Sequence, residues 1–216
     1  MISQNLQLRL LTGILLFFLV SLIFISDFLL VYSLIVLGIL SVLEFFNLMS
    51  KISIKKNYKF IFNIIFTLYI FIFCFLFLFF SFSFQLKVIT FIILIGCISS
   101  DIGGYIFGKT FKGPKLTKIS PNKTIAGSLG SFALASLTTL SLIFLETNIV
   151  NFSIFLIGLV TSLFCQLGDL FFSFLKRKAK LKDTGNFLPG HGGILDRLDG
   201  IFFGVPFGFI TLTLLF

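Results

Sequence analysis

The chain has 216 residues and a net charge of +9, yet only 12% of its residues are charged and 57% are hydrophobic. A soluble domain carries about a quarter charged residues, and the mean hydropathy here is +1.14. These values exclude a soluble core and predict an integral membrane protein. The positive charge suits a surface next to anionic lipid headgroups, so we expect membrane lipids and no nucleic acid as partners.

Apolar runs separated by charged or turn-rich stretches predict an all-α, polytopic transmembrane helical bundle. A spanning helix needs about 20 apolar residues, which gives about seven spans, with roughly six to nine allowed. The predicted spans are residues 10–25, 28–49, 60–80, 88–107, 126–145, 152–175 and 194–216. Residues 60–84 also suit a tilted helix or a short extra hairpin. The first run lacks a cleavage pattern and is expected to be retained.

The cations indicate the orientation of these spans. With the N-terminus inside, every Lys and Arg except Lys87 falls on one side, mainly in residues 51–59, 109–123 and 176–197. Such a bias marks the cytoplasmic face.

Cys74, Cys97 and Cys165 lie in apolar segments without metal-ligand spacing, so neither a disulfide framework nor a zinc site is expected.

The end of the sixth predicted span carries an acid that needs an explanation. If residues 152–175 are helical, Asp169, Ser173 and Lys176 share one face. A carboxylate within a spanning helix costs about 2.5–3.5 kcal/mol on insertion scales. Asp169 should therefore face a wet cavity, a cation or a partner. The simpler alternative is a carboxylate that is only neutralised by Lys or protonated.

A glycine-rich turn precedes the last predicted span. Residues 189–193 allow close backbone approach, and Asp196 and Asp199 then follow as i, i+3 neighbours on a helix. Together with Asp169 they would make an oxygen-rich site suited to Mg²⁺. His191 is expected to brace the turn or contact phosphate, with proton transfer as the alternative.

A third group of polar residues surrounds the predicted fourth loop. Residues 99–109 place Asp101 and paired glycines at the end of a span, and residues 120–130 place Ser120, Asn122 and Lys123 before a new helix. This pattern is typical of a polyanion-binding surface. It lacks the spacing of a nucleotide-binding P-loop.

Residues 173–199, SFLKRKAKLKDTGNFLPGHGGILDRLD, resemble the signature of phosphatidate cytidylyltransferases, also called CDP-diacylglycerol synthases. Residues 166–169 and the segments around Asp101 and Lys123 add to the resemblance, which covers about residues 96–207. Two features depart from the family pattern. Ile125 and Ala126 stand where the family usually has a bulky aromatic and an acid or amide, and the chain is short for the family by one or two spans.

The resemblance implies transfer of CMP from CTP to phosphatidic acid, which gives CDP-diacylglycerol and pyrophosphate. It implies Mg²⁺, with a monovalent cation such as K⁺ assisting, and Asp169 and Asp196 as metal-binding residues. The residues expected to take part in catalysis are Asp169, Asp196, Lys182, Asp183, Ser173 and His191. Those expected to bind substrate are Asp101, Ser120, Asn122, Lys123, Lys176, Arg177, Arg197 and Asp199.

We therefore expect one membrane domain over residues 1–216, with hydrophobic spans in 1–95, a catalytic half in 96–216 and its signature at 173–199. The active site should face the cytoplasm from a bacterial inner membrane, with a homodimer left open. Arg197 has an alternative role, pairing with Asp196 or Asp199. The competing functions are a polyprenol kinase-like enzyme, an archaeal-lipid cytidylyltransferase and, from another class, a transporter.

Overall fold

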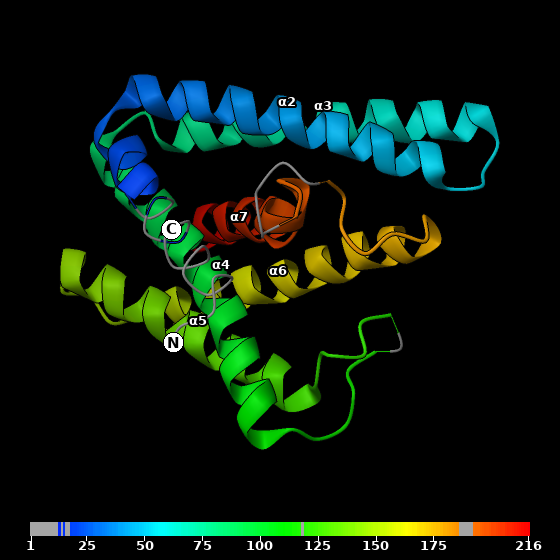
Figure 1. The fold of residues 1–216 in the computed structure, drawn as a ribbon. Helices are drawn as coiled ribbons and strands as arrows, with labels where there is room; N and C mark the ends of the chain where they lie inside the picture. Colours follow the sequence, from blue (N-terminus) through cyan, green and yellow to red (C-terminus); the bar gives the residue numbers. More distant parts are fainter. Residues whose placement is uncertain (1–12, 14, 16–17, 118, 186–191) are drawn as a thin grey trace, which may run out of the picture. The chain divides into compact units, whose positions relative to one another are not determined.

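The computed structural model describes residues 13, 15, 18–117, 119–185 and 192–216, and its named elements are all helices (Figure 1). Residues 18–25 are helical. The long helices that follow are α2 (Asp27–Lys51), α3 (Lys56–Phe80), α4 (Phe84–Phe111), α5 (Ile125–Thr147), α6 (Phe152–Lys178) and α7 (Leu195–Leu215). Among the described residues these 6 helices are long and apolar enough to cross a membrane. The chain is an integral membrane protein, and the predicted all-α, polytopic class is confirmed.

The helices are mostly longer than the predicted spans. Five of the six begin before or end after the apolar run, because flanking residues, such as Lys56 in α3 and Lys178 in α6, continue the helical hydrogen bonding. Residues 56–80 form a single helix, so the long Phe-rich stretch contains no extra hairpin before Phe80. The first predicted span, residues 10–25, lies partly outside the described residues.

The chain divides into two compact units. The first unit contains Met1–Leu78 and Lys178–Arg197, and the second contains Phe79–Arg177 and Leu198–Phe216. The segment that resembles the family signature is therefore split between the two units, with its central part in the first.

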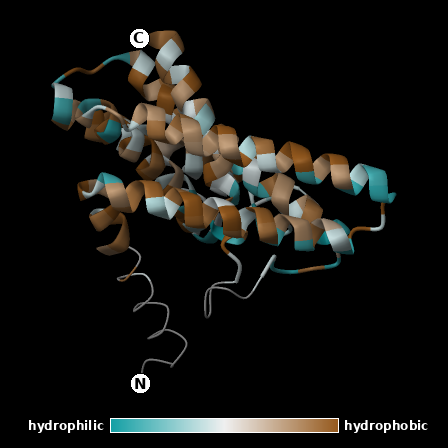
Figure 2. Cartoon of the chain, turned by 90° about the horizontal axis from the view of Figure 1, so that it is seen from above, coloured by the Kyte–Doolittle hydropathy of each residue, from teal (hydrophilic) through white to brown (hydrophobic). Residues whose placement is uncertain are grey.

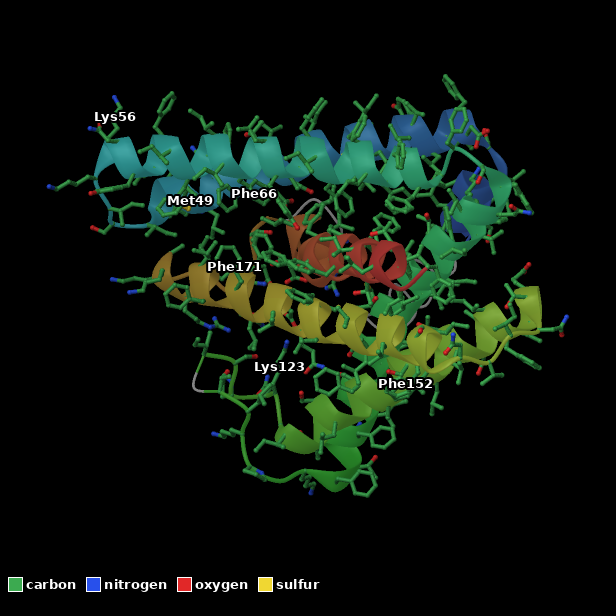
Figure 3. All side chains as sticks on the ribbon, turned by 180° about the vertical axis from the view of Figure 1, so that it is seen from behind. Met49, Lys56, Phe66, Lys123, Phe152 and Phe171 are labelled. Atoms are coloured by element: carbon green, nitrogen blue, oxygen red, sulfur yellow. The ribbon has the colours of Figure 1, made fainter. Side chains whose placement is uncertain are left out.

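In the first unit, α2 and α3 form an antiparallel pair (Figure 1). Phe45 of α2 stacks on Phe66 of α3 with ring centroids 3.9 Å apart. Figure 3 labels Phe66 on α3. Other large side chains of α3 point outward, and Phe71 is 70% exposed. Hydrophobic residues cover these helices, while hydrophilic residues gather near helix ends and in loops (Figure 2). Such an apolar exterior is expected of a surface that meets lipid rather than water.

In the second unit, small residues bring α4 and α5 into close contact. A Cβ added at Gly103 would lie 2.5 Å from the carbonyl oxygen of Gly130. The buried Ser131 hydroxyl donates to the carbonyl of Ser100 at 2.7 Å, and the hydroxyls of Ser100 and Ser162 lie 2.8 Å apart. Small side chains and interhelical hydrogen bonds are the usual means of helix association in membranes. They hold α4, α5 and α6 together around the polar pocket described next.

We predict that Gly103→Ala lowers the melting temperature of the detergent-solubilised protein. The new methyl group would meet the backbone oxygen of Gly130, which cannot move away as a flexible side chain could. Overpacking of this kind costs about 1–3 kcal/mol. Gly13→Ala is the matched control, because none of the residues that the structure describes lies within 4 Å of a Cβ at Gly13. Equal melting temperatures for the two variants would contradict the tight α4–α5 contact.

Candidate active site

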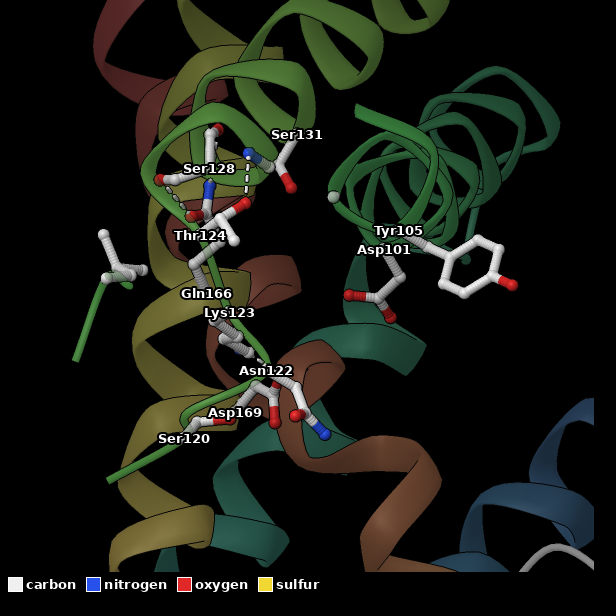
Figure 4. A pocket seen from close by; sticks show the side chains of 13 residues that line it. Asp101, Tyr105, Ser120, Asn122, Lys123, Thr124, Ser128, Ser131, Gln166 and Asp169 are labelled. Atoms are coloured by element: carbon white, nitrogen blue, oxygen red, sulfur yellow. Dashed lines mark hydrogen bonds and ion pairs between the residues drawn. The ribbon is translucent and has the colours of Figure 1, made fainter. Parts of the chain in front are cut away.

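A polar pocket of about 370 Å³ opens within the second unit (Figure 4). Its walls come from α4, the loop at residues 112–124, α5 and α6. The lining residues are Asp101, Gly104, Tyr105, Leu116, Ser120, Asn122, Lys123, Thr124, Gly127, Ser128, Ser131, Gln166 and Asp169. The volume falls in the range of small-molecule sites, about 300–1,000 Å³. Five residues that the sequence predicted for the site, Asp101, Ser120, Asn122, Lys123 and Asp169, meet here.

The loop at residues 112–124 positions Lys123 at the pocket. Leu116 N–H donates to the carbonyl of Lys123 at 2.8 Å, and Lys123 N–H donates to the carbonyl of Ser120 at 3.1 Å. The loop leaves α4 through two residues with positive φ, Lys112 at 53° and Gly113 at 100°. Positive φ suits glycine. The loop thus turns back on itself and presents Lys123 beside the start of α5.

The N-terminus of α5 forms another wall of the pocket. Thr124 caps this helix, and its hydroxyl accepts a hydrogen bond from Gly127 N–H at 3.1 Å. The first turn of α5 contains no acidic residue. Since the first amides of a helix carry partial positive charge, this wall is suited to a negatively charged oxygen.

Asp169 of α6 and Lys123 form an ion pair inside the pocket (Figure 4). Gln166, one turn earlier on α6, accepts a hydrogen bond from the Ser128 hydroxyl at 2.5 Å. Gln166 also donates to the Ser162 hydroxyl at 3.3 Å. The α6 wall of the pocket therefore carries two polar side chains. The Asp169 carboxylate pairs with Lys123 of the loop, and the Gln166 amide is hydrogen-bonded to Ser128 of α5.

Two further predicted residues of the second unit, Lys176 and Asp199, form an ion pair. Their closest nitrogen and oxygen lie 3.8 Å apart, and the backbone N–H of Gly200 donates to the same carboxylate at 2.9 Å. Ser173, on the same helix as Lys176, is half-buried, and Arg177 is exposed.

In the first unit, Asp196 stabilises the signature segment. One of its carboxylate oxygens accepts hydrogen bonds from Thr184 N–H at 2.7 Å and from Gly193 N–H at 3.0 Å. Lys182, Asp183 and Arg197 are exposed. The predicted site residue His191 lies outside the described residues.

Sequence reasoning missed Gln166 as a pocket residue and missed Glu44 entirely. Glu44 lies in α2 and accepts hydrogen bonds from residues 184, 194 and 195 of the same unit. The signal that could have found it is the rarity of acids inside apolar spans.

The donor set of the polar pocket fits Mg²⁺. Within the part of the chain that the structure describes, no three Asp, Glu, His or Cys side chains are grouped to hold a metal ion by themselves. Mg²⁺ does not need such a group, because it is commonly held by one or two carboxylates together with water and substrate phosphates. Asp101 and Asp169 line one pocket and meet that description. The assignment of Asp196 as a ligand stays a prediction.

Comparison with known proteins agrees with this chemistry. A family model described as the cytidylyltransferase family matches residues 2–215. The chain belongs to the cytidylyltransferase family. The resemblance noted from residues 173–199 is thereby confirmed.

Curated relatives of the family cover part of the chain. A phosphatidate cytidylyltransferase of Bacillus subtilis (strain 168) is 44% identical over 127 residues, which is 56% of this chain and 47% of the relative. One of Rickettsia felis (strain ATCC VR-1525 / URRWXCal2) is 42% identical over 125 residues, which is 53% of this chain and 55% of the relative. The chain thus spans about half the length of the curated relatives it matches.

We predict that Gln166→Leu destabilises the protein by about 1–3 kcal/mol, because it leaves the Ser128 hydroxyl without its acceptor. Thermal unfolding in detergent measures the effect. Gln85→Leu is the control, since Gln85 is exposed on α4. Adding Ser128→Ala to Gln166→Leu should recover part of the loss. If the two substitutions are simply additive, the Ser128–Gln166 bond does not contribute as described.

Proposed function

We propose that the chain is a phosphatidate cytidylyltransferase that transfers CMP from CTP to phosphatidic acid. The observation that carries the proposal is the polar pocket, in which a helix N-terminus and Lys123 face Asp169 and Asp101 in a chain of the cytidylyltransferase family. The negative charge of a nucleoside triphosphate is offset by positively charged groups of the protein and by a metal ion held by oxygen ligands. The relatives named above support the choice of phosphatidate as the lipid.

The reaction would be an in-line displacement at the α-phosphorus of CTP. A phosphate oxygen of phosphatidic acid forms the new P–O bond, and the bond to the β-phosphate oxygen breaks to release pyrophosphate. The phosphate monoester is already anionic, so no strong general base is needed. The task of the chain is to orient the reactants and to offset charge on the transferred group.

Different residues of the pocket would bind the triphosphate, orient the nucleotide and hold the metal ion. The α5 N-terminus and Lys123 would bind triphosphate oxygens, while Ser120 and Asn122 would orient the nucleotide from the loop. Asp169 and Asp101 would hold Mg²⁺, which when bound supplies positive charge against the substrate phosphates. Lys123 would then exchange Asp169 for phosphate as its partner.

The remaining cations would serve the polyphosphate. In the second unit, Lys176 and Arg177 would hold the triphosphate or the departing pyrophosphate, with Arg suited to two parallel hydrogen bonds. The same role for Lys182 and Arg197 stays a prediction. The monovalent cation and a homodimer stay predictions.

The decisive experiment supplies the purified protein with labelled CTP, phosphatidic acid and Mg²⁺ and identifies the lipid product. We expect CDP-diacylglycerol, and we expect Asp169→Asn to lower turnover at least about a hundredfold, because it removes a metal-binding charge without changing the shape of the side chain. The control is Asp27→Asn, which changes an exposed acid at the start of α2.

A phosphorylated polyprenol or a CDP-activated archaeal-type lipid as the favoured product would replace phosphatidate as the substrate. Near-normal turnover of Asp169→Asn at limiting Mg²⁺ would remove Asp169 from the site.

We further propose that the loops at residues 51–59, 109–123 and 176–193 face the cytoplasm of a bacterial inner membrane. The support is the placement of every Lys and Arg except Lys87 on one side of the predicted spans. Single cysteines introduced into these loops, in a background without Cys74, Cys97 and Cys165, should react with a membrane-impermeant thiol reagent only after the membrane is opened. Labelling of any of these loops in intact cells would overturn this orientation.

A further inference from the structure

Glu44 of α2 binds a segment that is far away in the sequence. Its Oε1 atom accepts a hydrogen bond from Ile194 N–H at 3.0 Å. Its Oε2 atom accepts from Leu195 N–H at 2.8 Å and from the Thr184 hydroxyl at 2.9 Å. All four residues belong to the first unit. Both oxygens of the Glu44 carboxylate thus accept hydrogen bonds from the signature segment, from Thr184 in its middle and from Ile194 and Leu195 nearer its end.

Two of these donors are groups that a helix cannot satisfy by itself. Ile194 and Leu195 stand at the start of α7, where the first amides have no intrahelical acceptor. The same end of a helix carries partial positive charge, so a carboxylate is the acceptor it favours most. Glu44 therefore caps α7 from another helix.

The segment is shaped around the Glu44 carboxylate. A Cβ at Gly185 would lie 2.7 Å from Oε1, and a Cβ at Gly193 would collide with Oε2. Thr184, which precedes Gly185 and whose hydroxyl also lies against Gly193, is only 2% exposed. A Cβ at Gly193 would also lie 2.8 Å from the backbone nitrogen of Gly185, so close approach explains why this position lacks a side chain.

Glu44 and Asp196 share Thr184 as a partner and otherwise bind neighbouring residues. Thr184 donates its hydroxyl to Glu44 and its backbone N–H to Asp196, at 2.9 Å and 2.7 Å. Gly193 N–H donates to Asp196, and the next amide, Ile194 N–H, donates to Glu44. A shift of the segment away from Glu44 would therefore move the donors that orient Asp196.

We infer that Glu44 is a positioning residue for the reaction: by binding Thr184, Ile194 and Leu195 it fixes the part of the signature segment that carries Lys182, Asp183 and Asp196. This inference rests on the proposed function, because those three residues are the ones expected to act on substrate. Glu44 itself does not contact substrate in this role, since its oxygens are bound by the segment. It acts by holding Asp196 and the adjoining chain in one arrangement.

The test compares Glu44→Gln with Glu146→Gln, the matched change at the exposed glutamate near the end of α5. Glutamine keeps the shape of Glu44 but turns an NH₂ group toward at least one of the three donors. Hydrogen–deuterium exchange of the peptide that contains residues 192–197 should become about tenfold faster or more. Losing a hydrogen bond to a charged group raises the equilibrium constant for local opening by about this factor, and exchange follows that opening. Glu146→Gln should leave this exchange unchanged.

Enzyme kinetics provide the second readout. We expect Glu44→Gln to lower kcat at least about tenfold while KM for CTP changes less than about threefold, because a misplaced segment weakens transition-state contacts more than ground-state binding. A purely structural role would instead lower the melting temperature and leave kcat of the folded fraction unchanged. Unchanged exchange or unchanged kcat in the folded Glu44→Gln protein overturns the inference.

A second variant covers the case in which Glu44→Gln does not fold. Thr184→Val removes one of the three hydrogen bonds and keeps the shape of the side chain. It should speed exchange of the same peptide and lower kcat, and where the double variant folds, the two changes should combine less than multiplicatively. If Thr184→Val matches the wild type in both readouts, the inference fails.

The two proposals fail separately. A wild-type protein that forms no CDP-diacylglycerol refutes the proposed function, whereas faster exchange in Glu44→Gln would still establish that Glu44 holds the segment.

Discussion

A carboxylate that leaves water for the interior of a membrane protein must find hydrogen-bond donors or a cation, since burying it unpaired is very costly. Three acids of this chain meet the requirement in three ways. Glu44 accepts hydrogen bonds from two backbone amides and a hydroxyl. Asp169 pairs with Lys123, and Asp199 pairs with Lys176 and the amide of Gly200. Much of the polar organisation of both units follows from where these partners are found.

The partners differ in how easily they can be exchanged. Backbone amides at the start of α7 are fixed by the fold, so Glu44 is bound by groups that no ligand can replace. Lys123 lies on a loop, and a flexible ammonium group can turn to another anion. The acid with rigid partners therefore suits a supporting role, and the acid with a mobile partner suits a binding site.

Much of this arrangement could be predicted from the sequence, because apolar runs of spanning length leave little choice but helices. The same local reasoning placed Asp169, Ser173 and Lys176 on one helix and Lys123 before another, as α6 and α5 show. Glu44 could have been noticed as an acid inside an apolar span, but its partners could not be found in this way. Its donors lie 140 to 151 residues further along the chain, and no periodicity links such distant positions. Gln166 was visible as part of a motif, but its bond to Ser128 depends on how α5 and α6 pack.

The backbone contact between α4 and α5 has a consequence for how a ligand reaches the polar pocket. Around Gly103 and Gly130 the backbone of each helix lies against the other helix, with Phe107 and Leu134 packed beside the two glycines, so this pair cannot part without breaking tight packing. In the described part of the loop at residues 112–124, Leu116 N–H donates to the carbonyl of Lys123, and Lys123 pairs with Asp169 of α6. We therefore expect the loop to move more readily than the helices, in which case the frequency of its opening would limit how fast the pocket fills and empties.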